Sequence, residues 1–378
     1  MRVSVFNKAH FNIKIGSVVF PAFDETFINV GSTDSFFKEV RSDKRLRVGK
    51  INNEQYKAKY NLVEGNNINM VLDVYSQHNG KAYEHAVKAL ADPIIKHLDK
   101  NDVGYVDRPL KGLNCRFFNS TRIKEHGKCP VGPHDIFFSH GIGDKNYWIG
   151  KHIKDFNYAF VPGEAWRDRM IKTGYKGKIY ITGYTKLDPL INGEIKENKK
   201  DKPYVVWMPT HGYHHKYKGR SSYPQCMKLI EEIPDIYYKN VAMHPTSKLN
   251  NKKKHTPTMQ DLIDCDVVIA DAGSTLYEAW ILGKPVIFPD WICKNDVLGH
   301  FKKDPDNFEY KIYNENIGYH AKDMDHLISL IDKALSDGMQ DREKEFINYI
   351  YPEKLRGKAG ETAAKYLNEL KEELLKDE

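Results

Sequence analysis

One segment, residues 267–285, combines residue types that could bind a phosphate. An apolar run ends in Asp271, and Gly273, Ser274 and Thr275 then open a helical stretch that carries Glu278 about one turn later. Free amides, the helix dipole and two hydroxyls at a helix start bind anions, and a glycine lets a phosphate approach the backbone. Glu278 shares a helix face with Ser274 and could bind a ribose diol. A capped helix with nothing bound is the alternative, but the combination favours a phosphate site.

Two histidines stand where apolar runs end. His140 follows the run IFFS and opens the glycine loop HGIGDK, which also contains Gly141 and Lys145. His244 ends the run VAMH one strand-helix unit before the Ser274 helix, so we expect it near the same sheet edge. An imidazole there can deprotonate a hydroxyl or donate to a phosphate, and Lys145 is a candidate for a donor phosphate or an anionic acceptor. Taken singly, each histidine is better explained as a turn residue bonded to backbone, and it is the order of the motifs around them that favours chemistry.

Two further strand-to-loop junctions, at Gly183 and at Pro209–Thr210, could supply backbone or hydroxyl donors to a ligand, or be plain turns. The histidines of the stretch 211–215 could bind a metal, but the stretch is basic and has no carboxylate, so we expect a solvated loop and no metal. No GxSxG, P-loop or paired CxxC motif is present. A hydrolase triad therefore has no local support.

The composition limits the class of protein. The chain has 378 residues, too many for one compact core, and its 40% hydrophobic and 29% charged residues are typical of a soluble globular protein. A net charge of +7 fits an anionic ligand, a nucleic acid or an anionic membrane surface. The five scattered cysteines predict reduced thiols. No apolar run approaches the roughly 20 residues of a membrane helix and no signal-peptide pattern opens the chain, so we expect a cytoplasmic protein.

The pattern along the chain predicts an α/β protein with two Rossmann-like, doubly wound domains facing across a cleft. Short strands fill the first 60 residues, and short apolar runs then alternate with helical stretches. The polar stretch 192–203 is predicted to be a linker, and after it apolar runs again alternate with helical stretches. We expect an N-terminal domain over 1–190, a C-terminal nucleotide-binding domain over 200–350 and a final helix over 351–378.

Taken in order, these motifs resemble those of the CDP-glycerol glycerophosphotransferase family, the primases and polymerases of teichoic acid synthesis. The resemblance runs over about residues 68 to 365. The segments that carry it are YSQHNGKAY, SHGIGDK, TGYTKLD, MPTHG, VAMHP and ADAGSTLYEAWILGKPVIF.

The resemblance implies a GT-B fold with the nucleotide on the C-terminal domain and the acceptor on the N-terminal domain. It implies His140 as the general base on an acceptor hydroxyl and His244 on the donor phosphate, without a metal. Gly273 and Glu278 stand where the family tends to have Ser and Asp, which is closer to the nucleotide-sugar GT-B glycosyltransferases. The residues expected at the donor are Gly141, Lys145, Gly183, Pro209, Thr210, Gly273, Ser274, Thr275 and Glu278.

The leading functional hypothesis is glycerophosphate transfer from CDP-glycerol to a hydroxyl of a glycan or polyol phosphate. A UDP-sugar glycosyltransferase acting on a capsule or cell-wall glycan, or on hydroxymethylated DNA bases, is the second hypothesis. A non-catalytic nucleotide- or glycan-binding module is the third. The nucleotide-diphosphate donor, of CDP or UDP type, would be a substrate, and no cofactor is expected. A peripheral membrane contact is left open, and no obligate protein partner is evident.

Overall fold

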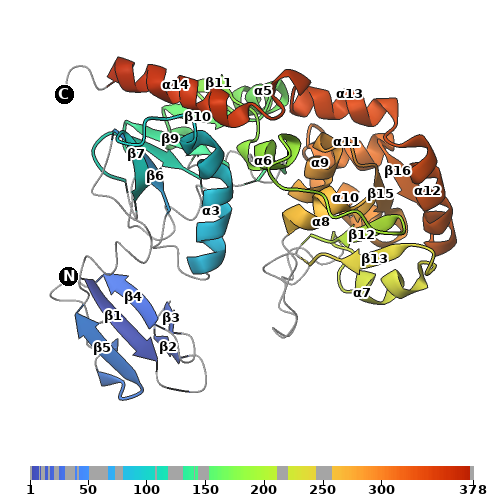
Figure 1. Ribbon diagram of the computed structural model, residues 1–378, viewed down its shortest axis with the longest axis horizontal. Coiled ribbons are helices and arrows are strands. Elements are labelled where there is room, and N and C mark those ends of the chain that lie inside the picture. The colour runs from blue at the N-terminus through green and yellow to red at the C-terminus, as the bar shows by residue number, and fades with distance from the viewer. Residues whose placement is uncertain are drawn as a thin grey trace.

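The computed structural model describes residues 2–7, 9, 13–15, 18–20, 25–29, 39–40, 42–50, 67–72, 80–106, 109–117, 131–139, 141–143, 153–210, 220–243 and 258–374. Figure 1 shows a small antiparallel sheet and two larger parallel sheets with their helices. We call the α/β units around the two parallel sheets the first and second domains. Among the described residues, no helix is both long and apolar enough to cross a membrane.

The N-terminal residues form small antiparallel pairings. Strand β1 (Arg2–Asn7) lies between β4 (Glu25–Asn29) and β5 (Leu46–Lys50). Strands β2 (Ile13–Ile15) and β3 (Val18–Phe20) form a separate hairpin. The alternating burial of β2, with Ile13 and Ile15 buried and the lysine between them exposed, is what a strand with one covered face produces.

The first domain is built on a six-stranded parallel sheet in the order β11-β10-β9-β8-β6-β7. The strands β6, β8 and β9 are buried along their whole length, as expected for a parallel sheet covered on both faces. They are not uniformly apolar, because they also bury Asn69, Asn114, Arg116 and Asp135. In chain order the strands are β6 (Ile68–Val71), β7 (Val103–Val106), β8 (Leu113–Arg116), β9 (Asp135–Phe138), β10 (Tyr158–Val161) and β11 (Lys178–Ile181).

The helical segments of the first domain are α3 (Gly80–Ile95), η2 (Ile153–Asp155), α5 (Glu164–Lys172), η3 (Thr185–Leu187) and α6 (Asp188–Ile191). Proline lacks the N–H of an intrahelical bond, and the sequence therefore predicts a kink or break at Pro93. The helix α3 nevertheless continues past Pro93 to Ile95. Because Pro93 lies in the last turn, few helical residues follow it.

The second domain is built on a five-stranded parallel sheet in the order β13-β12-β14-β15-β16. The strands are β12 (Tyr204–Met208), β13 (Tyr238–Val241), β14 (Val267–Ala270), β15 (Val286–Pro289) and β16 (Tyr319–Ala321). The helical segments are α7 (Cys226–Leu229), η5 (Ile230–Glu232), α8 (Thr258–Asp264), α9 (Ser274–Ile281), α10 (Asp290–Phe301), α11 (Phe308–Glu315), α12 (Met324–Asp337), α13 (Asp341–Ile350) and η6 (Glu353–Leu355).

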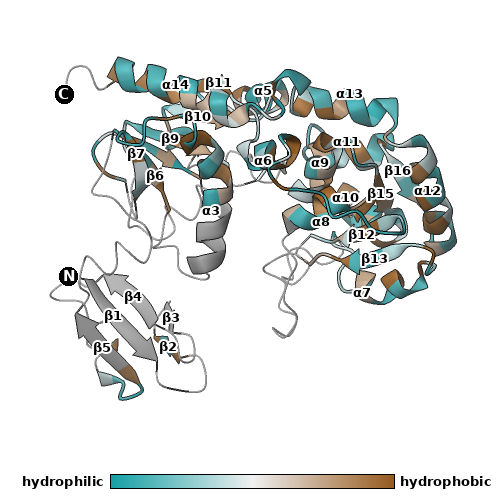
Figure 2. Ribbon diagram, viewed as in Figure 1, coloured by the Kyte–Doolittle hydropathy of each residue, from teal (hydrophilic) through white to brown (hydrophobic). Residues whose placement is uncertain are grey.

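The last helix, α14 (Ala359–Leu374), returns to the first domain, where it packs against α3. The amide of Gly360 in its first turn donates to Oδ2 of Asp188 at 2.7 Å, which fixes the start of the helix. One continuous apolar core joins both domains, and it includes the edge-to-face contact between Trp166 and Phe308. Figure 2 shows the brown, apolar residues concentrated on the strands and inner helix faces.

Candidate functional site

The chain order reverses between two neighbouring strands of the second sheet. The chain passes from β12 to β13 at one edge, then crosses to β14 on the other side of β12 and continues outward to β16. In doubly wound sheets, ligands bind outside the carboxyl ends of the strands at such a reversal. The loops that leave β12 and β14 begin with Pro209–Thr210 and with Asp271–Gly273. The fold therefore places both predicted segments at the expected binding edge.

Asp271 fixes these loops to each other. Its side chain is fully buried, and Oδ1 accepts the amide of Thr210 at 2.8 Å. Oδ2 accepts both the amide and the hydroxyl of Ser222, at 2.6 and 2.8 Å. Burial raises the pKa of the Asp271 carboxyl, and the hydrogen bonds from Ser222 and Thr210 partly oppose that rise. Asp271 thus holds Thr210 beside the start of α9 and is itself fully occupied.

The N-cap residue of α9 is Gly273, which has no side chain with which to cap the helix. Its φ is 94°, in the left-handed region that favours glycine, and within the described ranges no side-chain cap hydrogen bond is formed at this end. Ser274 and Thr275, the first two residues of the helix, are partly exposed. The first amides of a helix have no intrahelical partner, so this end can accept an anion.

Glu278 lies one turn along α9 and is only 1% exposed. Its Oε1 accepts the Nζ of Lys186 at 2.7 Å and the hydroxyl of Tyr184 at 3.1 Å. Its Oε2 is buried and accepts no hydrogen bond in the part of the chain that the structure describes. Helical side chains tend to lean toward the N-terminus of their helix, and the contacts with Lys186 and Tyr184 fix the position of Oε1. A buried acceptor without a donor is costly, and a ligand hydroxyl would remove that cost.

The glycine loop after β9 reaches α9 from the first domain. The amide of Gly143 donates to Oγ of Ser274 at 3.1 Å. A side chain at Gly143 would bring its Cβ within 3.2 Å of the backbone of Gly273 and Ser274. Gly141 is buried and exchanges hydrogen bonds with the hydroxyl of Ser139. The loop that contains the predicted residue Gly141 therefore reaches the predicted Ser274 helix through Gly143, which was not among the residues expected at the donor.

Gly183 has a different environment from the other predicted donor residues. It has a φ of 90°, and a Cβ there would lie 2.7 Å from Cβ of Ala359 and 2.8 Å from the ring of Tyr351. Its backbone conformation and its close packing at the start of α14 both require glycine. Gly183 thus serves the segment that carries Tyr184 and Lys186, and its predicted contact with a donor stays a prediction.

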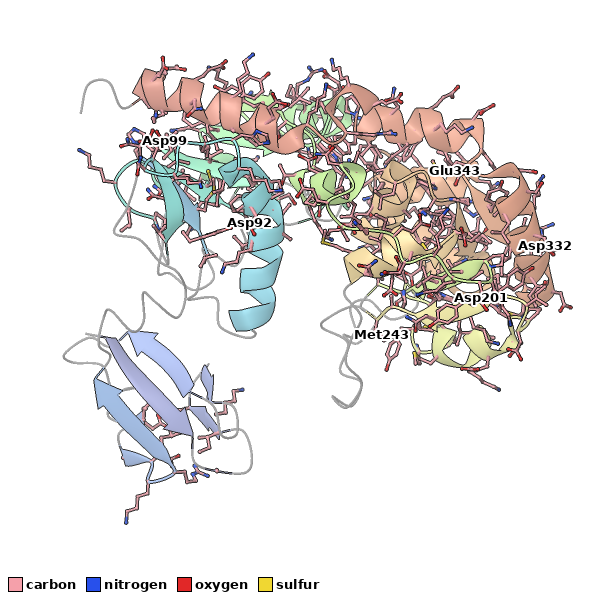
Figure 3. The ribbon with its side chains drawn as sticks, in the orientation of Figure 1. Asp92, Asp99, Asp201, Met243, Asp332 and Glu343 are labelled. Carbon is pink, nitrogen blue, oxygen red and sulfur yellow. The ribbon has the colours of Figure 1, made fainter. Side chains whose placement is uncertain are left out.

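His140, Lys145 and His244 lie outside the described residues, as does the histidine cluster 211–215. Met243, the last described residue before His244, follows β13 and is labelled in Figure 3. Within the described ranges, no group of three or more His, Cys, Asp or Glu side chains could hold a metal ion.

Solved structures with the same arrangement include two variants of the wall teichoic acid polymerase TagF. One superposes with a TM-score of 0.52 at 13% sequence identity, over 77% of this chain and 86% of that chain. Another, soaked with CDPG for 15 minutes, gives a TM-score of 0.50 at 12% identity, over 77% of this chain and 87% of that chain. The chain has the GT-B fold. The predicted resemblance to the teichoic acid polymerases is thereby confirmed at the level of the fold.

Other comparisons are weaker. UDP-GlcNAc 2-epimerase from Methanocaldococcus jannaschii, in complex with UDP-GlcNAc and UDP, gives a TM-score of 0.39 at 16% identity, over 88% of this chain and 87% of that chain. No family model matches the chain, and no curated protein matches it.

Proposed function

We propose that the chain is a GT-B transferase that binds a nucleotide-diphosphate donor at the start of α9. The observation that carries this proposal is the buried Oε2 of Glu278, which has no donor among the described residues and lies one turn from an uncapped, glycine-led helix start. The helix start suits a diphosphate, and the carboxylate oxygen suits a ribose hydroxyl. Their position at the strand-order reversal between β12 and β14 supports the same assignment.

The transfer that we favour moves glycerophosphate from CDP-glycerol to an acceptor hydroxyl. His140 takes the hydroxyl proton, and the acceptor oxygen attacks the distal phosphorus of the donor. The bond from that phosphorus to the bridging oxygen breaks, and CMP leaves with the electron pair. The first amides of α9, with Ser274, Thr275 and His244, would stabilise the negative charge that develops on the leaving phosphate.

Two observations bear on the choice of donor. The likeness in fold to TagF and the ordered motifs favour glycerophosphate transfer. A glycine at 273 and a glutamate at 278, however, favour the second candidate, transfer of a sugar from a UDP-sugar. In that reaction the acceptor oxygen attacks the anomeric carbon, and UDP leaves. The two reactions share the base and the anion site and differ in the nucleotide that is released.

The experiment that tests the proposal is incubation of the chain with CDP-glycerol and with a panel of UDP-sugars, with a simple polyol phosphate or glycan as the acceptor. Release of CMP supports glycerophosphate transfer, and release of UDP supports sugar transfer. If no donor is consumed while both the wild type and His140→Ala bind nucleotide equally, the chain is a binding module. Salt-dependent binding to duplex DNA would support the DNA version of the second candidate.

A further inference from the structure

The helix at the proposed donor site belongs to the second domain, but its polar side chains have partners in the first. On the first turn of α9, Ser274 accepts the amide of Gly143. On the second turn, Glu278 accepts the hydroxyl of Tyr184 and the ammonium of Lys186. These partners follow β9 and β11, so two strand ends of the first sheet meet one helix of the second domain.

The pair formed by Lys186 and Glu278 is unequal in its access to solvent. The Lys186 side chain is 23% exposed, whereas that of Glu278 is 1% exposed. A carboxylate so deeply buried is strongly destabilised when it has no cationic partner. In the described part of the chain, Lys186 is the cation that pairs with it. Lys186 therefore supplies the positive charge that faces the buried Glu278 side chain.

The contacts of Glu278 decide which of its oxygens can bind a ligand. Each carboxylate oxygen can accept hydrogen bonds. With Lys186 and Tyr184 both directed at Oε1, the second oxygen, Oε2, is left for another donor. The first domain thus determines which oxygen of Glu278 is available to a ligand.

We infer that Lys186 is a positioning residue for the donor. Its hydrogen bond to Oε1 holds Glu278 oriented so that Oε2 accepts a ribose hydroxyl, and it makes affinity for a ribonucleotide depend on the contact between the two domains. This inference rests on the proposed function, because it takes the ligand at α9 to be a nucleotide. It adds that recognition of the ribose requires a residue of the domain that does not carry the nucleotide.

The test compares two probes on the full chain. The affinity for CDP and for 2′,3′-dideoxy-CDP is measured by calorimetry, with UDP and 2′,3′-dideoxy-UDP as the second pair. Lys186→Met should weaken binding of the ribonucleotide on the order of tenfold or more, the value of a hydrogen bond to a charged group. Binding of the dideoxy nucleotide, which offers no ribose hydroxyl, should change by less than about threefold. Lys186→Arg keeps the charge and should recover most of the loss.

Lys294→Met is the matched control. Lys294 is also a partly buried lysine, 29% exposed, in an ion pair with a largely buried carboxylate, Asp290. Lys294→Met should leave the affinities for the ribonucleotide and for the dideoxy nucleotide unchanged. Tyr184→Phe removes one donor to Oε1 without removing a charge. If Lys186→Met does not fold, this variant still tests whether the contacts on Oε1 orient Glu278 for the ribose. It should weaken ribonucleotide binding alone, by about threefold.

The outcomes distinguish a failure of the role inferred for Lys186 from a failure of the proposed nucleotide site. Equal losses for the ribo and dideoxy nucleotides, or no loss for either, would overturn the role of Lys186 while leaving a nucleotide site in place. Equal affinity of the wild type for both forms would do the same, because Glu278 would then not contact the ribose. If the wild type binds neither CDP nor UDP, the proposed function itself is wrong, and the inference is overturned with it.

Discussion

The amide of Gly143 donates to the hydroxyl of Ser274 at 3.1 Å, and this hydrogen bond joins the two domains at the start of α9. Because the hydroxyl oxygen accepts from Gly143, its own proton remains available to donate elsewhere. The contact therefore orients the Ser274 hydroxyl as a donor. In the proposed reaction that donor would face the leaving phosphate.

Gly143→Ala should weaken this contact. The new Cβ would lie 3.2 Å from the backbone of Gly273 and Ser274, which is tighter than an ordinary contact, and backbone cannot move aside as a flexible side chain can. We expect nucleotide affinity to fall about threefold to tenfold, with a loss of roughly 1 kcal/mol in the free energy of unfolding. Gly299→Ala, where nothing lies within 4 Å of the new Cβ, is the control and should bind as the wild type does. Calorimetry on both variants checks this, and equal affinities would contradict it.

His140→Ala should abolish turnover without abolishing binding. A general base contributes on the order of a hundredfold to ten-thousandfold to a rate, so kcat should fall by that factor while nucleotide affinity stays within about threefold. His300→Ala, an exposed histidine at the end of α10, should keep full activity. Single-turnover assays with the preferred donor compare the transfer rate of each variant with that of the wild type. A wild-type rate in His140→Ala would remove His140 from the mechanism.

Asp188 should make stability depend on pH. Burial raises its pKa to about 6, and the amides of Gly360 and Ala359 oppose that rise. The folded chain therefore holds a proton between about pH 4 and pH 6 that the unfolded chain releases, since an unfolded aspartate titrates near pH 4. The free energy of unfolding should fall as the pH rises through this window, by up to about 3 kcal/mol, and stay low above it.

Asp188→Asn removes this titration and can still accept the amide of Gly360. Urea unfolding of both proteins should be measured between pH 4 and pH 8. As the pH rises, the free energy of unfolding of Asp188→Asn should increase relative to that of the wild type. A difference that does not change with pH would show that Asp188 does not titrate in this range.

The contact between the domains should also depend on Arg169. Its guanidinium, 6% exposed, forms hydrogen bonds with the carboxylate of Asp304, and helix α5 thereby holds the loop before α11. Arg169→Met leaves a carboxylate without its partner and should cost about 2 kcal/mol in the free energy of unfolding. Lys333→Met, which breaks an exposed pair with Asp337, should cost at most about 0.5 kcal/mol. If denaturant unfolding gives the same loss in free energy of unfolding for Arg169→Met and Lys333→Met, the contribution assigned to Arg169 is wrong.

The fold class could be predicted because it depends on local patterns. The run VVIA at 267–270 is buried along its whole length, as a strand covered on both faces must be. The alternation of such runs with helical stretches is enough to indicate two parallel sheets. The start of α9 at Ser274 could also be predicted, because a glycine followed by Ser and Thr after an apolar run marks a helix start locally.

The partners of the site residues could not be predicted, because they lie far away in the sequence. Lys186 and Glu278 are 92 positions apart, and Gly143 and Ser274 are 131 positions apart. The sequence indicated Glu278 as an acceptor for ribose, but nothing in its pattern showed that one oxygen would be occupied by the first domain. Asp271 is similar, since its role as the acceptor for Thr210 and Ser222 depends on how three loops meet.

The most direct test of the central claim is a crystal structure of the chain soaked with CDP, with UDP soaked in parallel. The account predicts that one of them places its diphosphate at the amides of Ser274 and Thr275 and a ribose hydroxyl at Oε2 of Glu278. A nucleotide bound elsewhere on the chain, with the start of α9 unoccupied, would contradict it.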